Sequence, residues 1–278
     1  MFRLPIGDVF ETFIDILKNN LGWLFDAIDF VLDNSISGLE WVFGIIPAII
    51  LIVLFGLLAW YISGKGLAIF TVVGLLIIDS MNLWGNAIDT LALVLVATLI
   101  TLLIGIPLGI WASRSNTIDK IIRPILDFMQ TMPAFVYLIP VVIFFGIGKV
   151  PGAIATITFS MPPVVRLTNL GIRQVPVNVV EAARSFGSTP KQMLFKVQLP
   201  IALPTILAGV NQTILLSLSM VVISAMIGAR GLGSPVLLGI EGMQTGRGFE
   251  GGLAVVILAM ILDRMTQALG NKRADKNK

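Results

Sequence analysis

The residue types that most often carry catalysis or metal binding are missing from this chain. It contains no Cys and no His, which excludes disulfides, thiol nucleophiles, thiolate metal sites and the usual imidazole base. No G-x-x-x-x-G-K-[ST] phosphate loop occurs, so the chain cannot bind and split ATP by the usual P-loop machinery. A G-x-G-x-x-G pattern at Gly246, Gly248 and Gly251 falls in a polar loop rather than after a strand, and we reject it as a dinucleotide site.

One polar, basic stretch has the spacing of a built structural element. Residues 181–200 read EAARSFGSTPKQMLFKVQLP and lie between two strongly apolar blocks. Pro176 is suited to open a helix as its first residue, and Gly187 to close it in a left-handed conformation. Residues 189–192 then provide a Thr cap, a Pro at the first helical position and a Gln placed to reach back. The pattern predicts a helix–break–helix elbow at a membrane surface, whose second piece is expected to end at Pro200 and Pro204.

This elbow resembles the cytoplasmic EAA loop of bacterial ABC-importer permeases. The family pattern is EAA, three residues, Gly, nine residues, an aliphatic residue, any residue and then Leu-Pro. The chain matches it at Glu181, Ala182, Ala183, Gly187, Val197, Leu199 and Pro200. The resemblance implies that these residues couple the permease to an ATPase: the small residues allow close approach and the glycine provides the turn. The alternative is an ordinary amphipathic loop between membrane helices.

The composition is that of an integral membrane protein. Of 278 residues, 56% are hydrophobic and 13% are charged, and the mean hydropathy is +0.95. A bilayer core of about 30 Å needs roughly 20 apolar residues as helix. We therefore expect an all-α protein with about seven transmembrane helices, near residues 45–62, 66–82, 88–112, 124–146, 150–170, 203–228 and 251–269.

The orientation follows from the distribution of Lys and Arg. If the elbow is cytoplasmic, 13 of the 19 basic residues fall in inner segments and five in outer ones, with Arg166 left unassigned because its depth is uncertain. We therefore expect a multi-pass protein of the bacterial cell membrane, with the N-terminus outside and the C-terminus cytoplasmic. Residues 271–278 would form a short basic cytoplasmic tail.

Residues 1–44 differ from the rest of the chain. They contain seven acidic and two basic residues, and their apolar residues recur at helical spacing. This pattern predicts one or two amphipathic helices in the outer membrane interface, where an acidic face is better tolerated than at the anionic inner leaflet. A loose tail and an eighth, poorly hydrophobic span are the alternatives.

Two groups of polar residues are candidates for lining a solute path. The segment around Pro133 combines polar and aromatic side chains, and a second set lies in the predicted span 203–228. Polar groups at membrane depth usually face the interior of a helix bundle, where they contact a solute or a neighbouring helix. The candidates are Gln130, Thr131, Phe135, Tyr137, Asn211 and Ser217. Core packing is the competing interpretation for these candidates. The five Trp residues lie near predicted span ends, which favours interfacial anchoring over a cation-binding aromatic cage.

Further stretches narrow the resemblance. PILDFMQTMPAFVYLIP, RLTNLGIRQVP and GVNQTILLSLSMVVISAMIGARGLG look like the glycine betaine/proline branch of these permeases. The resemblance implies a five-helix type I importer core over residues 85–270, with the EAA loop at about 176–204. Residues 45–84 would form an accessory transmembrane hairpin.

By this resemblance the chain is the transport subunit of an importer for osmoprotectant solutes, and not itself an enzyme. The expected partners are ATPase subunits, an extracellular substrate-binding protein, a second permease copy and membrane lipids, with no nucleic acid. No cofactor is expected in this chain, since ATP and Mg would be held by the ATPase. The alternatives are a permease for methionine or another amino acid, and an ion-coupled secondary transporter, which would need coupling residues at mid-membrane.

Overall fold

The structure, a computed structural model, describes residues 6–275, and within this range it is helical without a strand. The first five residues of the predicted region 1–44 and the last three of the predicted tail lie outside the described residues. The elements in chain order are α1 (Ile6–Ile45), α2 (Ala48–Ser63), α3 (Lys65–Ser80), α4 (Trp84–Arg114), α5 (Asn116–Thr131), α6 (Ala134–Phe145), α7 (Lys149–Arg173), α8 (Val177–Ser185), α9 (Pro190–Gln192), the π-helical segment η1 (Met193–Gln198), α10 (Leu199–Ala225), α11 (Gly233–Glu241) and α12 (Thr245–Asp275).

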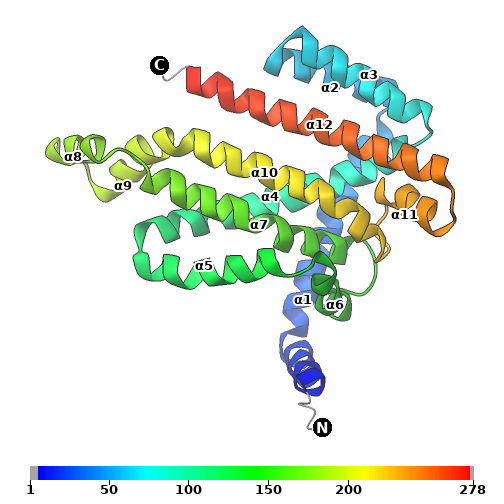
Figure 1. Ribbon diagram of the computed structural model, residues 1–278, viewed down its shortest axis with the longest axis horizontal. Coiled ribbons are helices and arrows are strands. Elements are labelled where there is room, and N and C mark those ends of the chain that lie inside the picture. Colours follow the sequence, from blue (N-terminus) through cyan, green and yellow to red (C-terminus); the bar gives the residue numbers. More distant parts are fainter. Residues whose placement is uncertain (1–5, 276–278) are drawn as a thin grey trace.

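Three long helices, α4, α7 and α10, form the centre of the molecule and run side by side (Figure 1). Small residues let their backbones approach. A Cβ atom at Gly109 of α4 would lie 2.7 Å from the carbonyl oxygen of Val165 in α7. A Cβ atom at Gly209 of α10 would lie 3.2 Å from the Cα atom of Val164. Helices in lipid associate through such close van der Waals packing, because burial from lipid supplies no hydrophobic drive.

Buried hydroxyl groups join the same three helices. Thr101 of α4 and Ser160 of α7 lie 3.4 Å apart at their oxygens, and Thr213 of α10 donates to the carbonyl oxygen of Ser160 at 3.1 Å. Thr98 of α4 donates to Ser217 of α10 at 3.4 Å. Each of these five side chains is buried, so the polar groups satisfy one another across the helix interfaces rather than in water.

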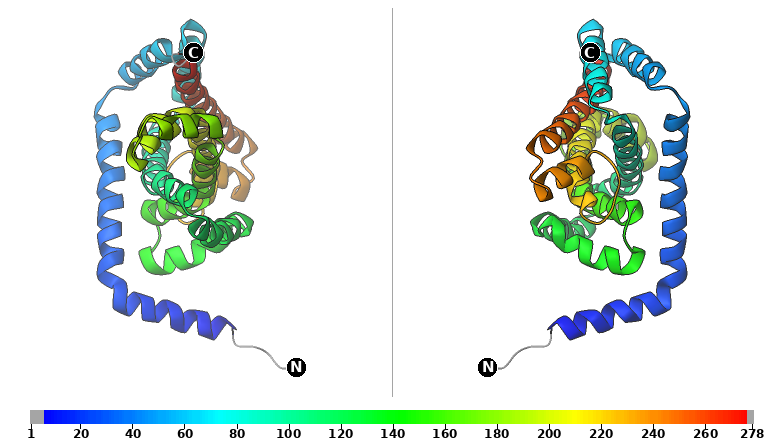
Figure 2. Two further views of the ribbon diagram at one scale, coloured as in Figure 1. Left: turned by 90° about the vertical axis from the view of Figure 1, so that its left-hand side faces the viewer. Right: turned by 90° about the vertical axis from the view of Figure 1, so that its right-hand side faces the viewer.

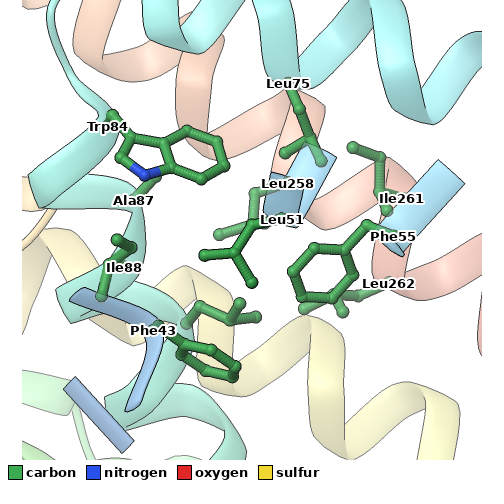
Figure 3. Close-up of a pocket in the computed structure, with 11 residues that line it drawn as sticks. Phe43, Leu51, Phe55, Leu75, Trp84, Ala87, Ile88, Leu258, Ile261 and Leu262 are labelled. Atoms are coloured by element: carbon green, nitrogen blue, oxygen red, sulfur yellow. The ribbon is translucent and has the colours of Figure 1, made fainter. Parts of the chain in front are cut away.

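The α2–α3 hairpin packs on α12 through a cluster of apolar side chains. Its centre holds a cavity of about 20 Å³, and Figure 3 shows the aliphatic and aromatic side chains around it. The indole nitrogen of Trp84 is buried without a hydrogen-bond partner there. A water molecule needs two to four polar partners to remain in such a void. We therefore interpret this cavity as a dry packing space and not as a solute site.

Helix α1 runs crosswise to the bundle helices, on one flank of the bundle (Figures 1 and 2). Its helical backbone is interrupted at Leu21, and it contacts α4, α6 and α7. Lys149, the first residue of α7, forms ion pairs with Glu40 at 3.1 Å and Asp33 at 3.4 Å. These charges attach α1 to the end of α7 that is opposite to α8.

The helices lie near the predicted spans, with two differences. Residues 124–146 do not form one straight span: α5 and α6 meet at an angle of 100°, with Pro133 at the break. Helices α2 and α3 have 16 residues each, about 24 Å of helix, which is shorter than a typical bilayer core. The described residues therefore contain four helices long and apolar enough to cross a membrane, or six if each bent pair is one span, against about seven expected.

Candidate functional site

The predicted turn at Gly187 closes α8. The residue has φ = +78°, and its N–H donates to the carbonyl oxygen of Arg184 at 2.9 Å. The N–H of Ser188 donates to the carbonyl oxygen of Ala183 at 3.1 Å. This pair of bonds is the Schellman arrangement, which requires a left-handed residue at this position. Pro176 lies at the cap just before α8, one residue earlier than the predicted first helical position.

The restart after the turn also follows the sequence pattern. The Thr189 hydroxyl accepts from the N–H of Gln192 at 3.3 Å, and the Gln192 side-chain oxygen accepts from the N–H of Thr189 at 2.9 Å. Arg114, at the end of α4, donates to the carbonyl oxygen of Pro190 at 3.0 Å. The elbow is therefore fixed by its own capping box and by a bond to the core.

The expected break at Pro200 and Pro204 was wrong. The chain runs without interruption from α9 through η1 into α10, and both prolines lie within α10. A π-helical turn shifts the hydrogen bonds by one residue, so it absorbs the missing N–H of Pro200 and relieves the clash of its ring with the preceding turn. The elbow thus consists of α8, a tight turn and one long helix.

The two halves of the matched motif lie in different surroundings. Glu181, Ala182 and Gly187 are exposed, and Ala183 is half-buried. Leu199 packs on a buried cluster that includes Ile172 of α7, and Ile106 of α4 packs on the same cluster. Val197 is half-buried and Pro200 is exposed. One half is thus available to a partner, and the other is attached to the helices of the core.

Sequence reasoning missed one conspicuous residue of this surface. Phe186 lies at the turn with its side chain 91% exposed, next to Gly187. A fully exposed aromatic ring beside small residues is the composition of an interface centre. Its position between Arg184 and Gly187 was visible in the sequence, but its exposure depends on the turn geometry.

Four of the six path candidates lie together at the α5–α6 bend. Gln130 and Thr131 end α5, whereas Phe135 and Tyr137 begin α6. The Tyr137 hydroxyl donates to the carbonyl oxygen of Met129, which braces the bend. Phe135 is exposed and Tyr137 is buried.

The other two candidates lie elsewhere, on α10. Ser217 is buried and donates to the carbonyl oxygen of Thr213 at 2.9 Å. Asn211 donates to Asp263 of α12 at 2.7 Å, and Gln267 donates to both oxygens of this carboxylate at 2.8 and 2.9 Å. Ser217 also accepts from Thr98 of α4, so these two residues join α10 to α4 and α12 and lie apart from the four candidates at the bend.

A polar network holds α5 against α7. Arg166 forms an ion pair with Asp127 at 2.5 Å and also donates to Gln130. One helical turn away, Asn169 donates to Asp119 at 2.7 Å. Arg166, whose depth the sequence left open, therefore compensates a carboxylate on the neighbouring helix.

Comparison with known proteins agrees with this geometry. Residues 105–274 match the family described as "Binding-protein-dependent transport system inner membrane component". The chain is 50% identical over 274 residues to the glycine betaine transport system permease protein of Bacillus subtilis, covering 99% of this chain and 97% of that one. It is 52% identical over 273 residues to the glycine betaine/carnitine transport permease protein of Listeria monocytogenes, covering 97% and 96% of the two chains.

A solved structure of the MetNI methionine ABC transporter has the same fold. The TM-score is 0.56 at 23% sequence identity, over 66% of this chain and 90% of that one. This likeness shows the fold alone. Together with the matched family and the relatives of near-equal length, it confirms the all-α membrane fold and the type I importer core expected from the sequence. The chain belongs to the inner-membrane permease components of binding-protein-dependent ABC transport systems.

Proposed function

We propose that this chain forms the membrane pathway of an ATP-driven importer of glycine betaine and related osmoprotectants. The observation that carries the proposal is the identity of 50% and 52%, over nearly the whole chain, to two permeases named for glycine betaine transport. The chain itself is not an enzyme, because ATP hydrolysis belongs to a separate subunit of such systems. ATP and Mg would be bound there, with no cofactor in this chain.

The two halves of the elbow support a coupling role. The exposed half, with Glu181, Ala182 and Phe186, would contact the ATPase, with Ala183 and Gly187 shaping that surface. The attached half continues as one helix into α10, and Leu199 packs on a buried cluster that also includes Ile172 of α7 and is covered by Ile106 and Ile110 of α4. Movement of the ATPase would therefore reach the core helices as a rigid displacement.

A second permease copy is the expected partner within the membrane. Helix α5 has one exposed apolar face, formed by Ile121, Ile125 and Phe128, which are 54–64% exposed. The α5–α6 bend follows that face directly in the chain, and its candidates Gln130, Thr131 and Phe135 are exposed, whereas Tyr137 is buried. We place the solute path between two such faces, and we expect lipids to cover the apolar α2–α3 hairpin.

The elbow and the far end of α12 lie at one end of the molecule (Figure 1), and the Lys149 ion cluster lies at the other. The ATPase subunits of such an importer lie on the cytoplasmic side of the cell membrane. The proposal therefore puts the elbow and the C-terminal end of α12 inside and α1 outside.

Uptake is expected to require ATP. Permease, ATPase and binding protein reconstituted together should accumulate labelled glycine betaine when ATP is enclosed with the ATPase, with or without a pH gradient. Uptake by the permease alone, driven by a pH gradient without ATPase, would contradict the proposal and favour an ion-coupled transporter. Accumulation of methionine in place of glycine betaine would instead favour the amino-acid alternative.

The outer position of α1 can be tested with one substitution. Because the chain has no Cys, Asn19→Cys creates a unique thiol on an exposed part of α1. An impermeant maleimide should label it in intact cells, while Ser185→Cys in α8 should react only after the inner face is opened. The opposite labelling pattern would invert the proposed orientation.

A further inference from the structure

A polar cavity of about 460 Å³ lies at the end of the bundle opposite to the elbow. This volume is within the range of small-molecule sites, about 300–1,000 Å³. Its walls come from α1, the start of α4, the α6–α7 connection and the α10–α11 connection. The charged lining residues are Asp29, Asp33, Glu40, Asp89, Lys149 and Arg230.

Part of this charge is used to hold α1. The Lys149 amino group donates to the Ser37 hydroxyl at 2.6 Å and pairs with Glu40 at 3.1 Å and Asp33 at 3.4 Å. A cation surrounded by three acceptors from one helix is satisfied. These four residues therefore account for the attachment of α1 and leave little binding capacity for a solute.

The other three charged side chains of the lining do not hold one helix to another. In residues 6–275, Asp29, Asp89 and Arg230 form neither a hydrogen bond nor an ion pair through their side chains. Asp89 and Arg230 are close enough to interact electrostatically. The cavity thus offers two carboxylates and one guanidinium that can turn to a ligand.

An aromatic ring completes the wall. Phe145 lines the cavity and is held edge-on by Phe25, with ring centroids 5.6 Å apart. An ammonium group with four carbon substituents has no N–H to donate, so proteins bind it by negative charge and by aromatic faces. A guanidinium binds a carboxylate through two parallel hydrogen bonds.

We infer that this cavity is an outer binding site for a small zwitterion with a quaternary ammonium group at one end and a carboxylate at the other. Asp89 and Asp29, with the ring of Phe145, would receive the cation, and Arg230 would receive the carboxylate. The inference rests on the proposed function for the choice of solute class, and it adds a site in the permease itself.

A second polar cavity, of about 270 Å³ between α5 and α7, provides a contrast. Its two carboxylates on α5 are already paired, Asp127 with Arg166 of α7 and Asp119 with both Arg123 of α5 and Arg173 of α7. The charged groups of this second cavity therefore hold α5 against α7. Among the cavities described for residues 6–275, only the outer one combines a suitable volume with side chains of both signs that form no hydrogen bond or ion pair.

The test is equilibrium binding of labelled glycine betaine and labelled choline to the purified full chain in lipid nanodiscs. Choline has the quaternary ammonium group but no carboxylate. Asp89→Asn should weaken the binding of both compounds by about tenfold, since it removes a charge facing the cation. Arg230→Gln should weaken the binding of glycine betaine by about tenfold and leave the binding of choline unchanged.

Arg247→Gln is the matched control, because Arg247 is an exposed arginine outside the cavity, and it should change neither affinity. If Asp89→Asn does not yield folded protein, Asp29→Asn replaces it with the same expectation. Absence of binding to the unaltered chain, or equal loss of both ligands in Arg230→Gln, overturns the inference. Uptake by the complete transporter is measured separately. If the variants bind both compounds as the unaltered chain does and uptake is normal, the binding site is refuted and the proposed function stands.

Discussion

Gly187→Val is expected to abolish solute uptake while the protein still inserts into the membrane. Gly187 has φ = +78°, a conformation that a β-branched residue adopts only at a cost of about 1–2 kcal/mol or more. No atom lies within 4 Å of the position of an added Cβ, so the effect is one of backbone conformation and not of collision within the chain. The changed turn would misdirect α8 relative to the helix that begins at Pro190, and the exposed surface at Glu181 would no longer meet the ATPase.

Gly187→Asn is the matched control, because Asn tolerates the left-handed conformation better than other residues with a side chain. It should retain most of the uptake and the ATPase association. The measurement is co-purification with the ATPase together with uptake in proteoliposomes. If Gly187→Val keeps both at normal levels, the coupling role of this loop is refuted.

Gly109→Leu is expected to cost about 3 kcal/mol of stability or to prevent folding. The added Cβ would lie 2.6 Å from the Cβ of Thr168 and 2.7 Å from the carbonyl oxygen of Val165, so α4 and α7 would have to separate. Backbone cannot move aside as the end of a flexible side chain can. The loss of stability is measured from the thermal unfolding of the detergent-solubilised protein, which is monitored by size-exclusion chromatography.

Gly85→Leu provides the control within the same helix. Gly85 is exposed and has no atom within 4 Å of an added Cβ, and Leu favours helix over Gly by somewhat less than about 1 kcal/mol. Its unfolding temperature should be unchanged or higher. Equal stability of the two variants would show that α4 and α7 are not held together by close backbone approach.

The surroundings of the motif explain why a short pattern extends over 20 residues. Its first half is exposed and its last aliphatic residue, Leu199, packs on the core. Under the proposed coupling role, a partner that displaced the first half would move α10 directly and would act on α4 and α7 through the cluster on which Leu199 packs. The capping box of Thr189 and Gln192 lies between the two halves and fixes the start of the second helix.

The elbow's turn, its restart and the positions of the long helices were determined by the sequence alone. Gly187, Thr189 and Gln192 act on backbone groups two to four residues away, and such local interactions do not depend on the rest of the fold. The apolar stretches are equally local, because the length of a helix in lipid follows from the count of consecutive apolar residues.

Only the tertiary structure decided which polar groups meet. Arg166 and Asp127 are 39 residues apart, and Lys149 and Glu40 are 109 apart, so their pairing depends on the rotation and register of packed helices. The passage of the helix through Pro200 was also decided there. Met193 and Leu194 are buried against the core, and the π-helical turn that places them there also accommodates the proline. Sequence patterns report interactions along one helix, whereas contacts between helices arise only when the packed faces are known.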